Sequence, residues 1–364
     1  MQSLDDRATV ERLDPGGMLR LAEKFPDQCR EALEIALATS IEPLKQQPNV
    51  VVLAGLGGSA AGGDLTKVLF EADGTVPFSV NREYDLPKFV DRRSLLFAVS
   101  YSGNTEETLA AYDAAKGRGA RVIAITSGGE LAERASACGD EVIKVPGGQP
   151  PRTALGYLFV PVASACVQLD LLSNLPFDAA FRALDEGAKL WGVEPPESDN
   201  TAKQIARSLH RSVGLLYGLG SWQAIVANRW KGQINENAKN MAFANAFPEL
   251  CHNEILGWVK ADGQGVDRWT TIDGQGVDRW TTIMLEDGTE SEKMRARARV
   301  TAQLIAKTTS VHSAQAIGGT LLEKALSLTY MGDFVSLYLA SLNGVDPESI
   351  DSINTLKSEL AKID

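Results

Sequence analysis

Several residue types that often carry chemistry are scarce in this chain of 364 residues. Its three histidines, His210, His252 and His312, show no HExxH spacing, so a histidine-rich metal site is not expected. Its four cysteines form no CxxC pair, which argues against a disulfide framework and favours reduced thiols in a cytoplasm. There is also no run of about 18 apolar residues, and the polar, acidic N-terminus is unlike a signal peptide. We therefore expect a cytoplasmic protein without a membrane span.

Acidic residues outnumber basic ones, and the formal net charge is −11. A nucleic-acid surface needs a basic stripe, so nucleic acid is not an expected partner. A small anionic ligand remains possible, because backbone N–H groups at the start of a helix bind anions without any cationic side chain. The hydrophobic content of 44% is ample for a packed globular core.

The first half of the chain alternates apolar strand-like runs with helical patterns. A helical lead-in precedes the first run, and a helical pattern at 105–119 separates two later ones. Near-continuous apolar strands between helices predict a parallel sheet that is covered on both faces. We expect one doubly wound α/β unit over about 46–150. The strand candidates are 50-VVVLA-54, 76-VPFSV-80, 94-SLLFAVS-100, 121-RVIAIT-126 and 141-EVIKV-145.

The second half shows the same alternation of strand-like and helical patterns. It begins after a helical stretch and a boundary rich in proline and acidic residues at 193–200. The run 213-VGLLYGLGS-221 resembles 51-VVLAGLGGS-59, and further strand candidates are 278-DRWTTIMLE-286 and 309-TSVHSAQA-316. The fold class is therefore α/β, with two doubly wound, mainly parallel sheets flanked by helices. The expected domains are a lead-in at 1–45, a first α/β domain at 46–150, a helical connector at 151–198, a second α/β domain at 199–330 and C-terminal helices at 331–364.

The second half also contains a tandem duplication, because DGQGVDRWTTI at 262–272 recurs identically at 273–283. An in-frame duplication or an artefact explains it more simply than an enlarged binding loop. Two identical copies compete for one strand position, so the register is poorly specified. We predict that the second copy, which runs into 284-MLE-286, takes the sheet position and that the first bulges out as a loop or hairpin.

A glycine-rich loop, 55-GLGGSAAGGD-64, directly follows the first strand. Gly55, Gly57 and Ala60 match the dinucleotide fingerprint loosely. That fingerprint needs an acid at the end of the second strand, where this chain has Arg82, which could face a 2′-phosphate. A dinucleotide site, a phosphate site and a purely structural turn all remain open for this loop.

A hydroxyl-rich loop, 100-SYSGNTEET-108, follows a later strand and opens a helix. Hydroxyl groups together with free N–H groups at a helix N-terminus are suited to a phosphate. Thr105 and Thr108 also fit simple N-capping, but capping accounts for only one hydroxyl. Neither loop contains lysine or arginine, and there is no GxxxxGK[ST], which excludes a P-loop ATPase. The polar side chains that crowd this loop are Ser100, Ser102, Asn104 and Thr105.

A third cluster of polar residues lies within 234–258 and comprises Glu236, Lys239, Glu249, His252, Asn253 and Glu254. Isomerising an aldose to a ketose moves a proton between adjacent carbons through an enediol, and one carboxylate can take and return that proton. Opening the sugar ring needs an acid–base group such as histidine. Glu236 and His252 are candidates for these roles, but folding has to bring them together within or between chains. A helical carboxylate that is simply solvated is the alternative.

Together these motifs resemble a known family. The pair 55-GLGGS-59 and 100-SYSGNTEET-108 is similar to the sugar isomerase (SIS) domain. The set 235-NENAK-239, 249-ELCHNEILGW-258 and 330-YMGDFVSLYLASLNGVDP-347 resembles the bifunctional phosphoglucose/phosphomannose isomerases, over about residues 46–364. The duplicated segment is foreign to that family.

The resemblance implies two SIS domains, at 46–150 and 199–330, in a homodimer with active sites at the interface. It implies a metal-independent isomerase, without a cofactor, that interconverts glucose 6-phosphate or mannose 6-phosphate with fructose 6-phosphate through a cis-enediol. The phosphate would be bound by Gly58, Ser59, Ser100, Ser102 and Thr105.

The same resemblance assigns the catalytic groups. Glu236 would be the base, and His252, contributed across the dimer interface, would open the ring. Lys357 in the C-terminal helices would assist ring opening, and Arg152 would stabilise the enediolate charge. Two alternatives stay open: a non-catalytic SIS module that binds or senses a phosphosugar, and a dinucleotide-dependent oxidoreductase.

Overall fold

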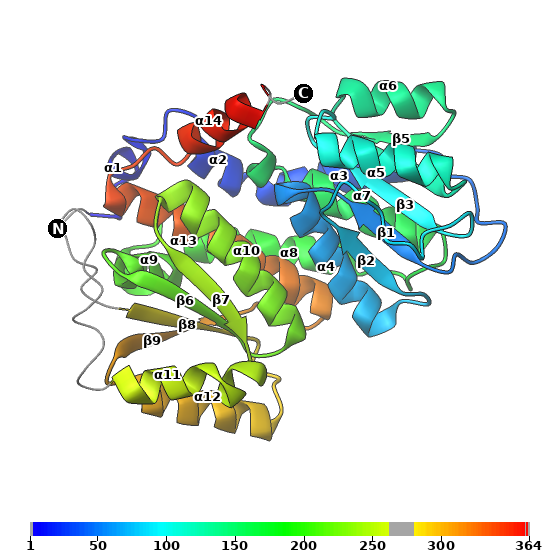
Figure 1. Ribbon diagram of the computed structural model, residues 1–364. Coiled ribbons are helices and arrows are strands. Elements are labelled where there is room, and N and C mark those ends of the chain that lie inside the picture. Colours follow the sequence, from blue (N-terminus) through cyan, green and yellow to red (C-terminus); the bar gives the residue numbers. More distant parts are fainter. Residues whose placement is uncertain (1–2, 262–279, 361, 363–364) are drawn as a thin grey trace. The chain divides into compact units, whose positions relative to one another are not determined.

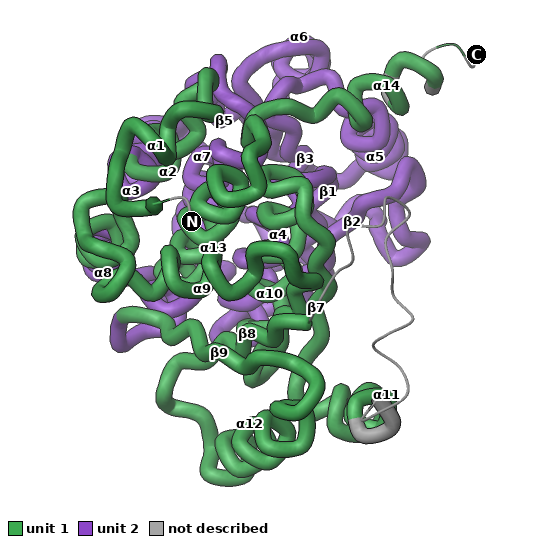
Figure 2. The backbone as a smooth tube through the Cα atoms, turned by 90° about the vertical axis from the view of Figure 1, so that its left-hand side faces the viewer, with its two compact units in different colours: residues 1–23, 186–317, 326–364 green, residues 24–185, 318–325 purple. Residues whose placement is uncertain are grey.

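The computed structural model describes residues 3–261, 280–360 and 362. These residues form two compact units that are each discontinuous in sequence (Figure 2). Unit 1 comprises residues 1–23, 186–317 and 326–364, and unit 2 comprises residues 24–185 and 318–325. The domain boundaries expected from the sequence stay a prediction.

Unit 2 contains a five-stranded parallel sheet with the strand order β2-β1-β3-β4-β5 (Figure 1). Its core is built from the apolar runs that predicted the strands, since every residue of β1 and β3 is buried. Helices α5 and α6 cover one face, and α4 with α7 covers the other. The predicted doubly wound unit is confirmed. Its strands are β1 (Val51–Ala54), β2 (Phe78–Asn81), β3 (Leu95–Val99), β4 (Arg121–Thr126) and β5 (Glu141–Lys144). Its helices are α3 (Phe25–Ala38), α4 (Gly57–Asp73), α5 (Glu106–Gly117), α6 (Gly129–Ala137), η1 (Pro151–Thr153) and α7 (Leu155–Gln168), and α8 (Phe177–Trp191) continues into unit 1.

Unit 1 contains a four-stranded parallel sheet with the order β7-β6-β8-β9. Helices α9 and α10 cover one face, and α11 and α12 cover the other (Figure 1). Strand β7, which the sequence reading missed, forms one edge. The strands are β6 (Val213–Gly218), β7 (Ala242–Ala246), β8 (Trp280–Glu286) and β9 (Thr309–Gln315). The helices are α1 (Arg7–Glu11), α2 (Met18–Glu23), η2 (Glu197–Asp199), α9 (Thr201–Leu209), α10 (Ser221–Ala238), η3 (Glu249–His252), α11 (Glu254–Ala261), α12 (Glu292–Ile305), α13 (Leu321–Asn343), which begins in unit 2, and α14 (Asp351–Leu360).

Of the two copies in the tandem duplication, the second contributes residues to the sheet. Strand β8 begins at Trp280, which belongs to the second copy, and continues through 284-MLE-286 in parallel register with β6 and β9. That part of the prediction is confirmed. The first copy, 262–272, lies outside the described residues, so its expected bulge stays a prediction.

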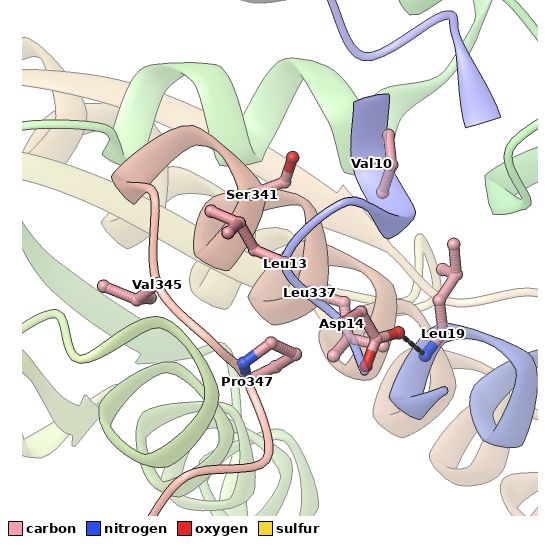
Figure 3. A pocket seen from close by; sticks show the side chains of 8 residues that line it. All are labelled: Val10, Leu13, Asp14, Leu19, Leu337, Ser341, Val345 and Pro347. Atoms are coloured by element: carbon pink, nitrogen blue, oxygen red, sulfur yellow. Dashed lines mark hydrogen bonds between the residues drawn. The ribbon is translucent and has the colours of Figure 1, made fainter. Parts of the chain in front are cut away.

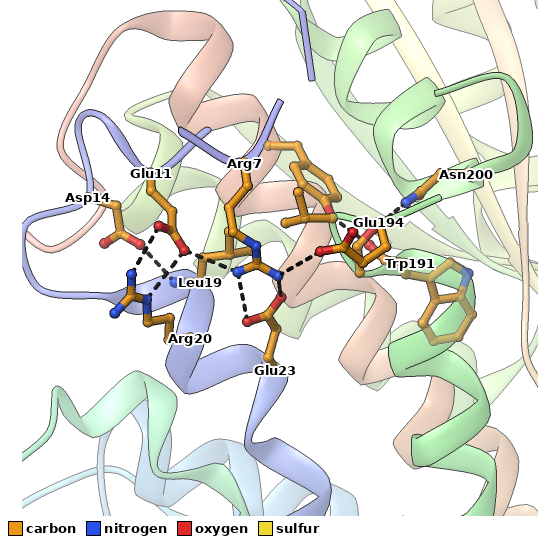
Figure 4. Close-up of polar contacts among 12 residues, drawn as sticks. Arg7, Glu11, Asp14, Leu19, Arg20, Glu23, Trp191, Glu194 and Asn200 are labelled. Carbon is orange, nitrogen blue, oxygen red and sulfur yellow. Dashed lines mark hydrogen bonds and ion pairs between the residues drawn. The ribbon is translucent and has the colours of Figure 1, made fainter. Parts of the chain in front are cut away.

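Within unit 1, charged side chains join the N-terminal helices to each other and to the segment before α9 (Figure 4). The Arg7 guanidinium lies 2.7 Å from a Glu23 carboxylate oxygen and 3.1 Å from one of Glu11. The Lys203 ammonium, with no exposed surface, donates to Val193 O at 2.8 Å and lies 3.2 Å from Asp5 Oδ1. A fully buried ammonium is tolerable because its donors meet oxygens.

A small hollow between these helices and α13 is lined mainly by apolar side chains, together with Asp14 and Ser341 (Figure 3). Its volume of about 10 Å³ has room for one water molecule at most, so it is no sugar site. Asp14 is itself engaged, because its carboxylate accepts hydrogen bonds from Met18 N at 2.8 Å and Leu19 N at 2.9 Å.

Helix α13 meets the length and composition criterion for a membrane-crossing helix, with a mean hydropathy of 1.2 over its most apolar window. This qualifies the expectation from the sequence, which found no uninterrupted apolar run of that length. The whole window is buried inside the fold, and the core helix of a globular protein passes the same test. Buried polar residues such as Thr329 and Asp333 interrupt the apolar pattern.

Candidate active site

The glycine-rich loop joins β1 to the first turn of α4. Gly57 has a φ of 52°, in the left-handed region that glycine adopts without steric cost. A Cβ on Gly58 would lie 2.6 Å from the carbonyl oxygen of Pro151, so only glycine lets η1 pack against this turn. Ser59 is buried in the same turn, and η1 carries Arg152, which is only 5% exposed. The loop therefore places helix-start N–H groups, one hydroxyl and the segment bearing Arg152 together.

The hydroxyl-rich loop joins β3 to α5 and is organised by Ser100. The Ser100 hydroxyl lies 2.9 Å from Thr105 Oγ1 and accepts a hydrogen bond from Gly103 N at 3.1 Å. Ser102 is exposed, and its hydroxyl accepts from Asn104 N at 3.2 Å. Thr105 occupies the N-cap position, but its side chain makes no capping hydrogen bond. The simple capping interpretation is therefore wrong for Thr105, whose hydroxyl is directed to Ser100 instead.

These two loops lie at the same edge of one sheet. Strands β1 and β3 are parallel neighbours with Ala54 opposite Ala98, so both loops leave the carboxyl edge. They also touch, because a Cβ on Gly55 would lie 2.8 Å from the carbonyl oxygen of Val99. Thr108, in the first turn of α5, adds a buried hydroxyl without a hydrogen-bond partner among the described residues. The arrangement offers N–H and hydroxyl groups to one anion from two neighbouring helices.

The dinucleotide alternative finds no support at its distinguishing residue. Arg82 would have to face a 2′-phosphate, but its guanidinium pairs with Asp64 on α4 at 2.5 Å. The last residue of β2 is Asn81 rather than an acid, and its side-chain N–H donates to Glu83 O at 2.8 Å.

In unit 1, the candidate base Glu236 lies half-buried in the last turn of α10. The preceding turns of α10 are held to α13, where Gln233 donates to the Asp333 carboxylate and the Arg229 guanidinium lies 3.6 Å from it. Burial raises the pKa of Asp333, and Arg229 opposes that shift. On either side of Glu236, Asn235 Oδ1 accepts from Ala242 N at 3.0 Å and the Asn237 side chain donates to Ser336 Oγ at 2.9 Å.

His252 lies at the other end of β7. It is exposed at the end of η3, which follows that strand. Glu254 beside it is engaged, because its carboxylate accepts hydrogen bonds from Tyr217 Oη and Asn245 Nδ2. The pKa of Tyr217 is raised, first by burial and then by its hydrogen bond to Glu254. Among the candidates in this segment, Glu254 is therefore a structural carboxylate.

The cluster 234–258 is consequently divided by β7 within one chain. Because Asn235 contacts Ala242, the last turn of α10 lies at the edge where β7 begins, whereas η3 follows the edge where it ends. Glu236 and His252 are not brought together. Lys357 lies on α14, but its side chain is outside the described part of the chain. Within the described residues, no group of three or more His, Cys, Asp or Glu side chains is placed to hold a metal ion.

Comparison with known families matches both halves of the chain. The SIS domain matches residues 44–158, and the bacterial phospho-glucose isomerase C-terminal SIS domain matches residues 198–360. A bifunctional phosphoglucose/phosphomannose isomerase from Caldicellulosiruptor bescii is 38% identical over 95% of this chain and 99% of its own. Another from Thermoplasma acidophilum is 35% identical over 85% of this chain and 89% of its own.

Solved structures share the fold at low identity. A hypothetical protein from Thermus thermophilus superposes with a TM-score of 0.72 at 16% identity, covering 99% of this chain and 93% of its own. Glucosamine-6-phosphate deaminase from Thermotoga maritima gives a TM-score of 0.63 at 16% identity, covering 90% and 96%. These two likenesses concern the fold alone, whereas the identity to full-length relatives carries the assignment. The chain belongs to the bifunctional phosphoglucose/phosphomannose isomerase family.

Proposed function

We propose that this chain interconverts glucose 6-phosphate or mannose 6-phosphate with fructose 6-phosphate. The observation that carries the proposal is the shared edge of β1 and β3, where two helix starts and the hydroxyls of Ser59, Ser100 and Thr105 converge without a cationic side chain in either loop. Family membership adds the two sugar phosphates by name, because its relatives are called phosphoglucose/phosphomannose isomerases.

In the proposed reaction, the phosphate is bound by the first turn of α4 and the loop before α5. The residues assigned to it are Gly58, Ser59, Ser100, Ser102 and Thr105. The carboxylate of Glu236 removes the proton from C2 of the open-chain aldose, and the carbonyl oxygen at C1 becomes a hydroxyl of a cis-enediol. Return of that proton to C1 gives the ketose as the C2 hydroxyl loses its own proton, which balances the proton that the C1 oxygen gained. One carboxylate therefore serves both directions.

The remaining assignments concern the ring and the developing charge. We assign ring opening to His252 of a second copy with the help of Lys357, and stabilisation of the enediolate to Arg152. A buried guanidinium suits the last role, because a preorganised cation in a low-dielectric setting stabilises a developing anion strongly. Loss of stereochemistry at C2 in the planar enediol allows both C2 epimers to share one base.

A homodimer is part of the proposal. The division of Glu236 and His252 by β7 supports it, since a single chain does not bring the two groups together. Two further observations agree. Strand β7 is an edge strand of the described sheet, and two large apolar side chains there are exposed, Met241 just before the strand by 57% and Phe243 within it by 47%. We also propose a cytoplasmic location, which the four free cysteines support.

A coupled assay with glucose 6-phosphate and with mannose 6-phosphate, run in the presence of a chelator, tests the activity. We expect turnover of both sugars with and without the chelator. Absence of activity on both sugars would contradict the bifunctional assignment. Activity that is seen without the chelator but lost in its presence would contradict metal independence.

The Glu236→Gln variant separates an isomerase from a module that only senses a phosphosugar. We expect undetectable isomerisation together with retained binding of fructose 6-phosphate, because glutamine keeps the size of the side chain but accepts no proton. Glu133→Gln, which changes an exposed carboxylate on α6, is the matched control and should keep full turnover. Unchanged turnover in Glu236→Gln removes the base assignment.

A further inference from the structure

Helix α10 ends at a residue type that its backbone conformation disfavours. Lys239, the C-cap, has φ 50° and ψ 36°, in the left-handed region. Glycine or asparagine normally occupies such a position, because a Cβ crowds the neighbouring carbonyl there. A lysine at this position persists only where contacts with its surroundings compensate for the strain.

That compensation is visible at the carbonyl end of the helix. The Lys239 ammonium donates to Glu236 O at 2.9 Å and to Asn237 O at 3.4 Å. It also donates to the carbonyl oxygen of Asp346, which follows α13. The last carbonyls of a helix carry partial negative charge and lack intrahelical partners, so an ammonium is well suited to them.

Neighbouring side chains complete the attachment of this turn to α13. The Asn343 side chain donates to Ala238 O at 2.9 Å, and the Asn237 side chain donates to Ser336 Oγ at 2.9 Å. Ser336 in turn donates to Asp333 O at 2.7 Å within α13. One of the carbonyls that Lys239 binds is that of Glu236 itself, so the lysine fixes the backbone from which the carboxylate projects.

We propose that Lys239 is a positioning residue for the reaction, which acts by holding the backbone of Glu236 against the end of α13. The proposal rests on the proposed function, in which Glu236 is the base. It assigns the lysine to catalytic geometry rather than to fold stability. Loss of its side chain should displace the carboxylate and slow proton transfer while phosphate binding, which uses loops of unit 2, is retained.

The test compares Lys239→Gly, Arg211→Gly and Glu236→Gln. Glycine suits the backbone of Lys239, so the first variant should fold with an unchanged melting temperature. We expect its kcat to fall by about 10- to 100-fold, because a small misplacement of a catalytic group slows a reaction by about that factor. KM should stay unchanged within about twofold. Arg211, an exposed residue that follows α9 with φ 62°, is the matched control, and Arg211→Gly should keep both constants.

The outcomes separate failure of this inference from failure of the proposed function. If Glu236→Gln abolishes turnover but Lys239→Gly keeps kcat, the positioning role is overturned and the base assignment stands. If Glu236→Gln keeps turnover, the base assignment fails and the role of Lys239 fails with it. A Lys239→Gly chain that does not fold, or a KM that rises together with a falling kcat, assigns the lysine to the fold and also overturns the proposal.

Discussion

Glu236 lies where strand β7 begins and His252 lies beyond the point where it ends, so the two residues are at opposite ends of that strand. A strand of this length spans roughly 15 Å at about 3.3 Å per residue. One hexose phosphate therefore cannot contact both Glu236 and His252 of the same chain, because the length of β7 separates them. In a two-fold symmetric dimer, the β7 strands of the two copies can lie side by side and antiparallel. The start of one strand would then lie beside the end of the other, and Glu236 beside His252 of a second copy.

Mixing two inactive variants tests this arrangement. We expect Glu236→Gln and His252→Ala to be nearly inactive alone and to regain activity after they are unfolded together and refolded. Mixed dimers hold one intact site, so random reassortment should restore about a quarter of the wild-type activity. Mixing Glu236→Gln with Glu236→Ala is the control, which should restore nothing. Failure of the first mixture to recover would place both groups of a working site in one chain.

The Ser100 hydroxyl contacts both Thr105 Oγ1 and Gly103 N, so Ser100→Ala should weaken phosphate binding. We expect KM for fructose 6-phosphate to rise by about tenfold, which is the typical effect of one lost hydrogen bond to a charged group. The change in kcat should be small, because the phosphate is bound equally in the ground and transition states.

Ser94 supplies the control for that measurement. It is buried just before β3 begins, at the opposite end from Ser100, and its hydroxyl donates to Asn49 Oδ1 at 2.9 Å. Ser94→Ala should lower the free energy of unfolding by about 1 kcal/mol and leave KM unchanged. Equal KM values for Ser100→Ala and wild type would remove Ser100 from the phosphate site.

Most strands were predictable because their sequences carry the signal of a buried parallel sheet. The runs at 51–54, 95–99 and 122–125 consist only of Val, Leu, Ile, Ala and Phe, which fits burial on both faces. Strand β7 was missed because AFANA has three alanines and an asparagine and no β-branched residue. Its place in the sheet is determined by pairing with β6, a long-range contact that local composition does not encode.

The site was predictable to a similar extent. Two loops that follow parallel strands share an edge by geometry, so the meeting of the Ser59 and Ser100 loops follows from the sequence pattern once the strands are placed. The capping role of Lys239 was not predictable, because a lysine gives no sign of a left-handed conformation. The assignments of Lys357 and Arg152 to the reaction stay predictions.

Burial lowers the pKa of His312 on β9 from its usual 6.5. The folded chain therefore favours the neutral imidazole, while the unfolded chain takes up a proton first as the pH falls. The stability that this residue contributes is present above pH 6.5 and is lost as the pH falls from there through the lowered pKa. The free energy of unfolding in urea, normalised to its value at pH 8, should differ between wild type and His312→Gln below pH 6.5. There the free energy of the wild type should fall more steeply. Parallel curves would contradict this prediction.

The duplication offers a test of how far β8 depends on a single copy. Deleting 262–272 and deleting 273–283 give the same sequence, because the two copies are identical. Since β8 begins within the second copy at Trp280, the shortened chain still supplies WTTIMLE to the sheet, preceded by DGQGVDR after α11. This length is closer to the usual connections of about 2–6 residues, and register competition between two copies is removed. We expect an unfolding midpoint and a kcat at least equal to those of the full chain. A fall in kcat with an unchanged midpoint would show that the extra copy contributes to the reaction.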